Sequence, residues 1–261
     1  IDQRGPGFPR VIPPEADMGA VEGPEVYSCD AFPVTVNDEA ELNAAILCYS
    51  GLTTPGSYTI SLGNDIDLTA ATYPAANPTA GVALVIEGNG NAIDGQDTPG
   101  VRPLSVAEDT TVTLNNATIT GGHTDDGGGI YNAGQMNLNQ VTVELNTAEN
   151  DGGGIYNALS GEMEINDSSV DSNQAIVPNG DGGGITNAGY MVITDSTVIS
   201  NSAEDNGLVL GGGIFNEGDL DVIRSTIANN TITVDEDEAF GGGIANQANL
   251  VIRDSTISGN S

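Results

Sequence analysis

The segment Gly-Gly-Gly-Ile-Tyr-Asn stands at 127–132 and returns at 152–157, and its general form, Gly-Gly-Gly-Ile-x-Asn, occurs five times in the second half of the chain. Successive copies lie 25, 30, 29 and 30 residues apart and begin at Gly127, Gly152, Gly182, Gly211 and Gly241. Such a period is typical of stacked structural units, each unable to bury its apolar face alone. The repeat therefore predicts a solenoid.

Each repeat carries a second marker, Ser/Thr-Val/Ile-x-x-Asn. The distance from the first marker's Asn to the second marker's Asn is 14 residues in four repeats and 16 residues in the other. Insertions are therefore expected mostly after the second Asn. These second asparagines are Asn146, Asn173, Asn201, Asn230 and Asn260.

The segments between the markers alternate apolar and polar residues, as at 191–194 and 220–223, and are rich in β-branched residues. Alternation bounded by Gly and Asn indicates β-strands. One repeat thus corresponds to one coil of a parallel β-helix with about three short strands. The same pattern at 84–87 and 112–114 places the first coil near residue 57. The predicted fold class is an all-β solenoid.

Equivalent residues of adjacent coils in a parallel stack lie about 4.8 Å apart, so each recurring residue forms a ladder. The recurring asparagines are expected to hydrogen-bond from coil to coil, and the isoleucines to stack inside. A phosphate-binding glycine loop is disfavoured because it needs a following helix and usually a Lys, and the chain has no Lys. The predicted amide ladder is Asn132, Asn157, Asn187, Asn216 and Asn246, and the aliphatic stack is Ile130, Ile155, Ile185, Ile214 and Ile244.

Composition restricts the partners. Five arginines stand against 37 acidic residues, for a net charge of -32. Such a charge excludes nucleic acid and anionic membranes as natural partners. No apolar stretch predicts membrane insertion of this segment. The scarcity of aromatic residues, with no Trp and 36 Gly, fits a long, thin, aliphatic core.

The acidic residues concentrate in turns and inserts, and stacked carboxylates about 5 Å apart repel each other by roughly 1 kcal/mol in water. Calcium, high external salt or splaying of solvated side chains could offset this repulsion. The calcium loop of EF-hands and the Gly-Gly-x-Gly-x-Asp nonapeptide are absent, so the calcium hypothesis depends on charge density alone. Its candidate ligands are Asp125, Asp126, Asp151 and Asp181, and no other cofactor is expected.

The N-terminal quarter differs from the repeats. Residues 1–24 contain five prolines and are expected to be extended. Residues 37–47 predict a short amphipathic helix that begins with an Asp38/Glu41 capping box and covers the open end of the solenoid. The chain is thus divided into an extended segment (1–24), a cap (25–56) and a β-helix (57–261). The helix face expected to be buried is Leu42, Ala45, Ile46 and Tyr49.

Cys29 and Cys48 flank the cap. One disulfide between them would close a loop of about 20 residues and contribute about 3 kcal/mol. Two free buried thiols are the alternative. Two cysteines and a single histidine cannot build a Cys/His metal cluster.

The repeat resembles that of the polymorphic outer membrane protein family of bacterial surface β-helices. Residues 41–46, Glu-Leu-Asn-Ala-Ala-Ile, resemble the Ser-Leu-Arg-Glu-Ala-Ile core of CSLREAI-type secreted proteins, although the leading Cys and the Arg are missing. These resemblances imply a right-handed parallel β-helix, an extracellular or cell-surface location, and adhesive roles without catalysis. Glycans and host or cell surfaces are the partners they imply.

Residues 2–5, 9–10 and 17–22 are similar to the segment with which those proteins close a β-helix at its C-terminal end. Here that segment stands at the start of the chain. We therefore expect it to complete a preceding unit, so that the chain joins copies of itself or adjacent modules head to tail in a fibre or stalk. An arbitrary chain boundary is the alternative.

A polysaccharide-binding or polysaccharide-cleaving β-helix is the second functional hypothesis. A lyase needs a base beside calcium-bound carboxylates, and a hydrolase needs two or three Asp that break the repeat at one place. Arg224 and Arg253 are expected at equivalent places of adjacent coils, as are Asp195 and Asp254, and no coil is expected to carry a unique polar cluster. A non-enzymatic structural or adhesive protein is therefore the favoured prediction.

Overall fold

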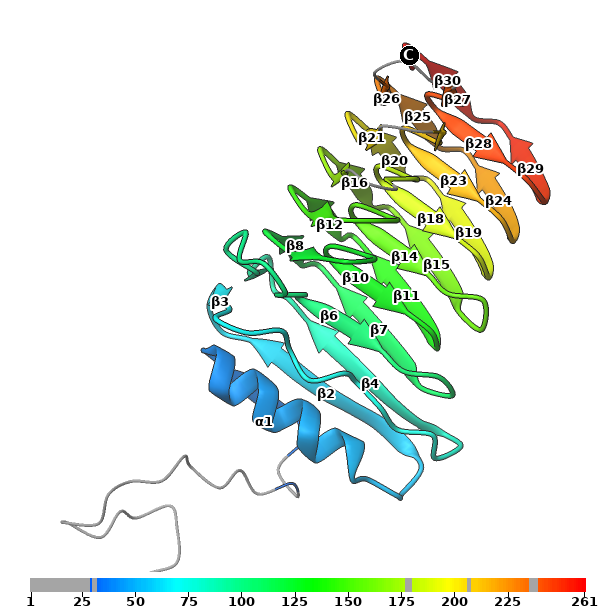
Figure 1. Cartoon of the computed structure of the whole chain (residues 1–261). Helices are drawn as coiled ribbons and strands as arrows, with labels where there is room; N and C mark the ends of the chain where they lie inside the picture. Colours follow the sequence, from blue (N-terminus) through cyan, green and yellow to red (C-terminus); the bar gives the residue numbers. More distant parts are fainter. Residues whose placement is uncertain (1–28, 30–31, 177–179, 206–207, 235–238) are drawn as a thin grey trace, which may run out of the picture.

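The computed structural model describes residues 29, 32–176, 180–205, 208–234 and 239–261. It shows a parallel β-solenoid of about eight coils with helix α1 (Glu39–Ser50) against one end (Figure 1). The predicted fold class, a parallel β-helix with a short N-terminal helix, is confirmed. The predicted extended segment, 1–24, lies outside the described residues. No helix in the described part of the chain is long and apolar enough to cross a membrane.

Strands of successive coils pair in parallel and form two long sheets in the described chain. The nine-stranded sheet contains β1 (Val34–Val36), β2 (Gly56–Leu62), β4 (Val82–Glu87), β7 (Thr111–Asn115), β11 (Gln135–Asn139), β15 (Glu162–Asn166), β19 (Tyr190–Thr194), β24 (Asp219–Ile223) and β29 (Asn249–Arg253). The eight-stranded sheet contains β3 (Ile66–Asp67), β5 (Ala92–Asp94), β8 (Thr118–Thr120), β12 (Thr142–Glu144), β16 (Ser169–Asp171), β20 (Thr197–Ile199), β25 (Thr226–Ala228) and β30 (Thr256–Ser258).

Shorter sheets complete each coil. The six-stranded sheet contains β6 (Leu104–Val106), β10 (Ile130–Asn132), β14 (Ile155–Asn157), β18 (Ile185–Asn187), β23 (Ile214–Asn216) and β28 (Ile244–Asn246). The five-stranded sheet contains β9 (His123–Thr124), β13 (Thr147–Ala148), β17 (Gln174–Ala175), β21 (Ser202–Asp205) and β26 (Thr231–Val234), and a further pair is β22 (Val209–Leu210) with β27 (Ala239–Phe240). The coil therefore has a fourth short strand beyond the three predicted, because the residues after the second Asn also pair between coils.

Alternation along the strands builds the core. In β11, Met136 and Leu138 point inward and are buried, whereas the residues on either side face outward. The register places Met136 beside Val112 and Met163, and Leu138 beside Leu114. Apolar side chains of adjacent coils thus stack in continuous rows, and this packing needs no large aromatic residues.

The glycine triplets meet a steric requirement of the tight turn before the six-stranded sheet. The first glycine of each triplet has a positive φ, from 61° at Gly127 to 74° at Gly211, where a side chain would be strained. At the second glycine, Gly128, an added Cβ would lie 2.4 Å from the carbonyl oxygens of Gly153 and Thr147. The triplet is therefore explained by backbone packing.

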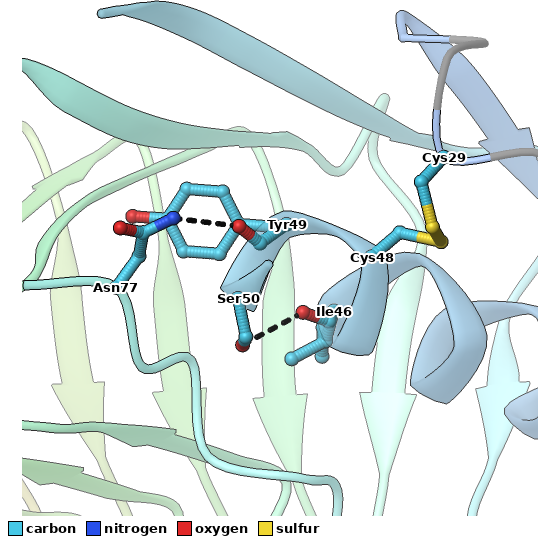
Figure 2. Close-up of a disulfide and its surroundings, with 6 residues drawn as sticks. All are labelled: Cys29, Ile46, Cys48, Tyr49, Ser50 and Asn77. Atoms are coloured by element: carbon cyan, nitrogen blue, oxygen red, sulfur yellow. Dashed lines mark hydrogen bonds between the residues drawn. A yellow bond between two sulfur atoms is a disulfide. The ribbon is translucent and has the colours of Figure 1, made fainter. Parts of the chain in front are cut away.

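Helix α1 covers the N-terminal end of the solenoid. The Asp38 side chain accepts a hydrogen bond from the Glu41 backbone N–H at 2.9 Å, and Glu41 Oε2 accepts one from the Asn37 backbone N–H at 2.7 Å. The predicted helix face is buried. The predicted disulfide joins Cys29 to Cys48 (Figure 2). Because β1 precedes α1 and pairs with β2, the nine-stranded sheet begins before the helix.

Candidate functional site

The asparagines of the first marker form a continuous chain of buried hydrogen bonds. Asn132 Nδ2 donates to Asn157 Oδ1 at 2.8 Å, and Asn157 donates to Asn187 in the same way at 2.8 Å. The chain continues from Asn187 to Asn216 at 2.8 Å and from Asn216 to Asn246 at 2.7 Å. All these amides donate in one direction along the solenoid.

The asparagines of the second marker form a parallel ladder in addition to the one assigned to the first marker. Asn146 Nδ2 donates to Asn173 Oδ1 at 2.9 Å, and the ladder continues through Asn201 and Asn230 to Asn260. Each oxygen from Asn173 onward also accepts the backbone N–H of the preceding asparagine. The markers' spacing in the sequence was the available signal for this ladder.

The isoleucines of the repeat lie in register between adjacent strands of the six-stranded sheet. Ile130, Ile155, Ile185 and Ile214 are fully buried. Ile244, in the C-terminal coil of the described chain, is half-buried. Together with the amide ladders, these residues make the inner framework of the solenoid.

Three of the four candidate calcium ligands form a row of carboxylates. The Asp151 backbone N–H contacts Asp126 Oδ1 at 3.5 Å, and the Asp181 backbone N–H contacts Asp151 Oδ1 at 3.4 Å. Burial raises the pKa of the Asp151 carboxyl to about 7, and the carboxylates of Asp181 and Asp126 add to this effect. Asp125, by contrast, is exposed.

Arg102 closes the N-terminal side of this row. Its Nη2 donates to the Asp126 carbonyl oxygen at 2.6 Å and to Thr124 Oγ1 at 2.9 Å. Its guanidinium lies 5.3 Å from the centre of the Tyr131 ring, which stacks on Tyr156. In the described residues, no group of three or more His, Cys, Asp or Glu side chains has an arrangement that could hold a metal ion. The carboxylates of the row therefore follow one another along the solenoid and do not surround a common metal position.

The expected equivalence of Arg224 and Arg253 is wrong. Arg253 pairs with Ile223, whereas Arg224 occupies the left-handed turn position held by Asp195 and Asp254 in the neighbouring coils. The turns between the nine-stranded and eight-stranded sheets are two residues long, 224–225 and 254–255 in these coils, so Arg224 lies in the turn whereas Arg253 is the last residue of β29. Arg224 instead forms a bidentate ion pair with Asp195, at 2.7 and 2.6 Å.

A polar groove that the sequence did not predict lies on the outside of the solenoid. The turn between β10 and β11 has two residues, Ala133 and Gly134, whereas the turns in the coils before and after it have four, 107–110 and 158–161. A short turn between two long ones leaves a notch. The groove has a volume of about 400 Å³.

The groove is lined mainly by uncharged polar groups and carboxylates. Its residues are Pro78, Thr79, Ala80, Gly81, Val82, Asp109, Thr111, Gly134, Gln135, Ser160 and Glu162. Thr111 Oγ1 donates to Gln135 Oε1 at 3.2 Å, and Gln135 Nε2 donates to Glu162 Oε2 at 3.1 Å. These bonds fix three neighbouring side chains across three coils.

Two residues, Ser160 and Asn77, hold the groove walls. Ser160 Oγ donates to Ala133 O at 2.9 Å and contacts Glu108 Oε1 at 3.2 Å, so one long turn reaches the other across the notch. The side chain of buried Asn77 donates to Tyr49 O at 2.7 Å (Figure 2). Its backbone N–H donates to Thr110 Oγ1 at 2.8 Å. The wall at 76–81 is thus attached to the C-terminal end of α1.

One of the comparisons with known proteins finds a match, to a family model. Residues 34–156, from β1 to β14, match the family model of a pectate lyase-like adhesive domain. No curated protein and no solved structure matches the chain. The matched segment contains α1, the 76–81 wall and most of the groove lining.

Proposed function

We propose that this chain is a non-enzymatic, extracellular adhesive β-solenoid. The family match and the disulfide, which is typical of oxidising compartments, support this function and location. The resemblance to polymorphic outer membrane protein repeats and CSLREAI-type proteins agrees with it. The groove is the observation that carries the proposal, because it interrupts the regular outer surface of the described coils and presents hydrogen-bonding groups there.

The chemistry of the groove favours binding over cleavage. A lyase needs a base to take a proton beside bound calcium, and no Arg or His lines the groove, while the chain has no Lys. A hydrolase needs a general acid in apolar surroundings, but Asp109 and Glu162 are exposed. Two arginines outside the groove are already engaged: Arg102 donates to backbone carbonyl oxygens, and Arg224 forms an ion pair with Asp195.

Adhesion and turnover can be measured on the same sample. Beads that carry the full chain should adhere to polysaccharide-coated surfaces or cells under flow, while release of reducing ends and of unsaturated sugars stays at the level of a protein-free control. Release of sugar products in proportion to protein concentration would refute the non-enzymatic assignment. Loss of adhesion to every surface would refute the adhesive one.

We further propose that modules of this kind join head to tail in a fibre or stalk. In the C-terminal coil, Ile252 and Ile257 are 41% and 46% exposed, although their neighbours in the preceding coil are buried. Residues 244–261 carry one Arg and one Asp and are therefore neutral, in a chain of net charge -32. An apolar, neutral surface with unpaired strand edges suits contact with another copy of this chain.

Electron microscopy tests the assembly. Because α1 covers the N-terminal end, direct stacking of a first coil on a last coil is blocked, and residues 1–24 are the proposed connecting segment. Fibres of the full chain that shorten or vanish when residues 1–24 are deleted would support the proposal. Isolated particles at every protein concentration would refute it.

A further inference from the structure

The groove beside the 133–134 turn has the dimensions of a site for a short, linear ligand. Its volume of about 400 Å³ lies within the range of about 300 to 1,000 Å³ typical of small-molecule sites. Its lining comes from the turns of four successive coils, a span of about 14 Å at 4.8 Å per coil. A chain of a few linked units fits this shape better than one compact molecule.

The lining selects against anions. Asp109 and Glu162 contribute carboxylates, and the neutral polar groups are the Thr111 and Ser160 hydroxyls and the Gln135 amide. With no Arg in the lining and a chain charge of -32, a phosphate, sulfate or uronate would be repelled. A ligand rich in hydroxyl groups can instead donate to the carboxylates, and such charge-assisted hydrogen bonds are the stronger ones.

Apolar contacts are present beside these polar groups. Pro78 and Val82 line the groove, and Leu159, in the long turn that forms one wall, is 85% exposed. Tyr190 is 46% exposed and pairs in register with Glu162, one coil beyond the groove. Exposed aromatic rings with a polar tip are common where a ligand has both apolar and polar faces.

We propose that the groove binds a neutral oligosaccharide, with Asp109 and Glu162 accepting hydroxyl hydrogens and Gln135 holding Glu162 in place. The inference rests on the proposed adhesive function and names its ligand class. Basic peptides are the other class of ligand that the groove carboxylates would attract. They are disfavoured because exposed carboxylates occur in most coils, so a basic ligand has no reason to prefer this groove.

Binding should be measured on the full chain by calorimetry and protein-observed NMR. The probes are neutral oligosaccharides of glucan, mannan, galactan, xylan and chitin type, together with oligogalacturonate and an oligolysine peptide. At least one neutral probe should bind, with an affinity that changes little between about 0.05 and 0.5 M salt, because screening weakens only charge-charge attraction. Binding of oligolysine or oligogalacturonate alone, or of no probe, would overturn the proposal.

Two matched variants locate the site. Glu162→Gln should weaken binding of the neutral probe about tenfold, the usual effect of losing a hydrogen bond to a charged group. Glu164→Gln is the control, since Glu164 is exposed on the same strand but does not line the groove. Equal affinities of the two variants would overturn the assignment.

Deletion of Leu159 and Ser160 tests the shape of the groove. It converts the 158–161 turn to Ala-Gly, the sequence of the two-residue turns at 133–134 and 188–189, so the fold should persist with an unchanged circular dichroism spectrum. Binding of the neutral probe should be lost. If the deletion variant is folded and binds the probe as before, the groove is not the site. If the natural protein adheres to surfaces but binds no neutral probe, the ligand class is wrong and the adhesive function stands.

Discussion

Asn173 Oδ1 accepts two hydrogen bonds from Asn146, one from the side-chain Nδ2 at 2.9 Å and one from the backbone N–H at 3.1 Å. One buried oxygen therefore satisfies both a side chain and the main chain of the preceding coil. In the other ladder, Asn187 Oδ1 accepts only the Asn157 side chain. The two ladders have the same residue type but different main-chain contacts: Asn173 Oδ1 accepts a backbone N–H of the preceding coil, whereas Asn187 Nδ2 donates to the carbonyl oxygens of Gly189 and Asp219 at 3.3 and 3.2 Å.

This difference predicts an order of stabilities. Asn187→Ala should lower the free energy of unfolding by about 1 to 3 kcal/mol, and Asn173→Ala by about 1 kcal/mol more, because it also leaves a buried backbone N–H without an acceptor. Urea denaturation followed by circular dichroism measures both. Asn137→Ala is the control, since Asn137 faces outward on β11. The ladder interpretation fails if all three variants unfold at the same urea concentration.

The Asp151 carboxyl predicts a pH dependence. Its pKa of about 7, against 3.8 normally, means that the folded state binds a proton more tightly than the unfolded state. Its contribution to stability is therefore greatest below about pH 4, decreases as the pH rises to about 7, and is constant above it. Asp151→Asn should be more stable than the natural protein by on the order of 1 to 3 kcal/mol at pH 8 and equal to it at pH 4.

Asp125→Asn is the matched control, because it removes one charge from an exposed neighbour of the same row. Thermal unfolding of the three proteins between pH 4 and pH 8 measures the effect. A constant difference between Asp151→Asn and the natural protein across this range would contradict the assignment.

The net charge of -32 predicts stabilisation by salt. As sodium chloride rises from about 0.01 to 1 M, the Debye length decreases from about 30 to 3 Å, and repulsion between exposed carboxylates weakens. The melting temperature should rise accordingly. Calcium that raises it at far lower concentration would identify specific binding at the carboxylate row. A melting temperature that is constant in both titrations would indicate that solvation alone compensates the carboxylates.

Removal of the disulfide is expected to lower the free energy of unfolding. Cys29 and Cys48 are 19 positions apart, and a loop of about 20 residues corresponds to about 3 kcal/mol in the loop-entropy estimate. The double variant Cys29→Ser/Cys48→Ser should lose about this much while its coils stay folded at room temperature. A reducing agent added to the natural protein should have the same effect and none on the variant. An equal loss of stability in the natural protein and in the variant would show that the reducing agent does not act through this disulfide.

The sequence predicted what recurs and missed what interrupts the recurrence. Asn132 and its equivalents were assigned to a ladder because identical residues at a fixed period must stack in a parallel solenoid. The groove at Gly134 was not predicted, because it depends on the lengths of neighbouring turns. Its signal was present as the 16-residue distance from Asn157 to Asn173, which reflects the two extra residues of one wall. Arg224 was wrongly aligned with Arg253, because the alignment of residues near a turn depends on backbone geometry that the sequence does not show.

The disulfide also determines how the molecule responds to a pulling force. Tension applied to the chain before Cys29 passes through the sulfur bridge to Cys48 and bypasses β1 and most of α1. The first strand to carry the load is then β2, which is held by β1 on one side and β4 on the other. A strand bonded on both sides resists peeling more strongly than an edge strand. An adhesive protein anchored through this end would therefore withstand shear at its first coil.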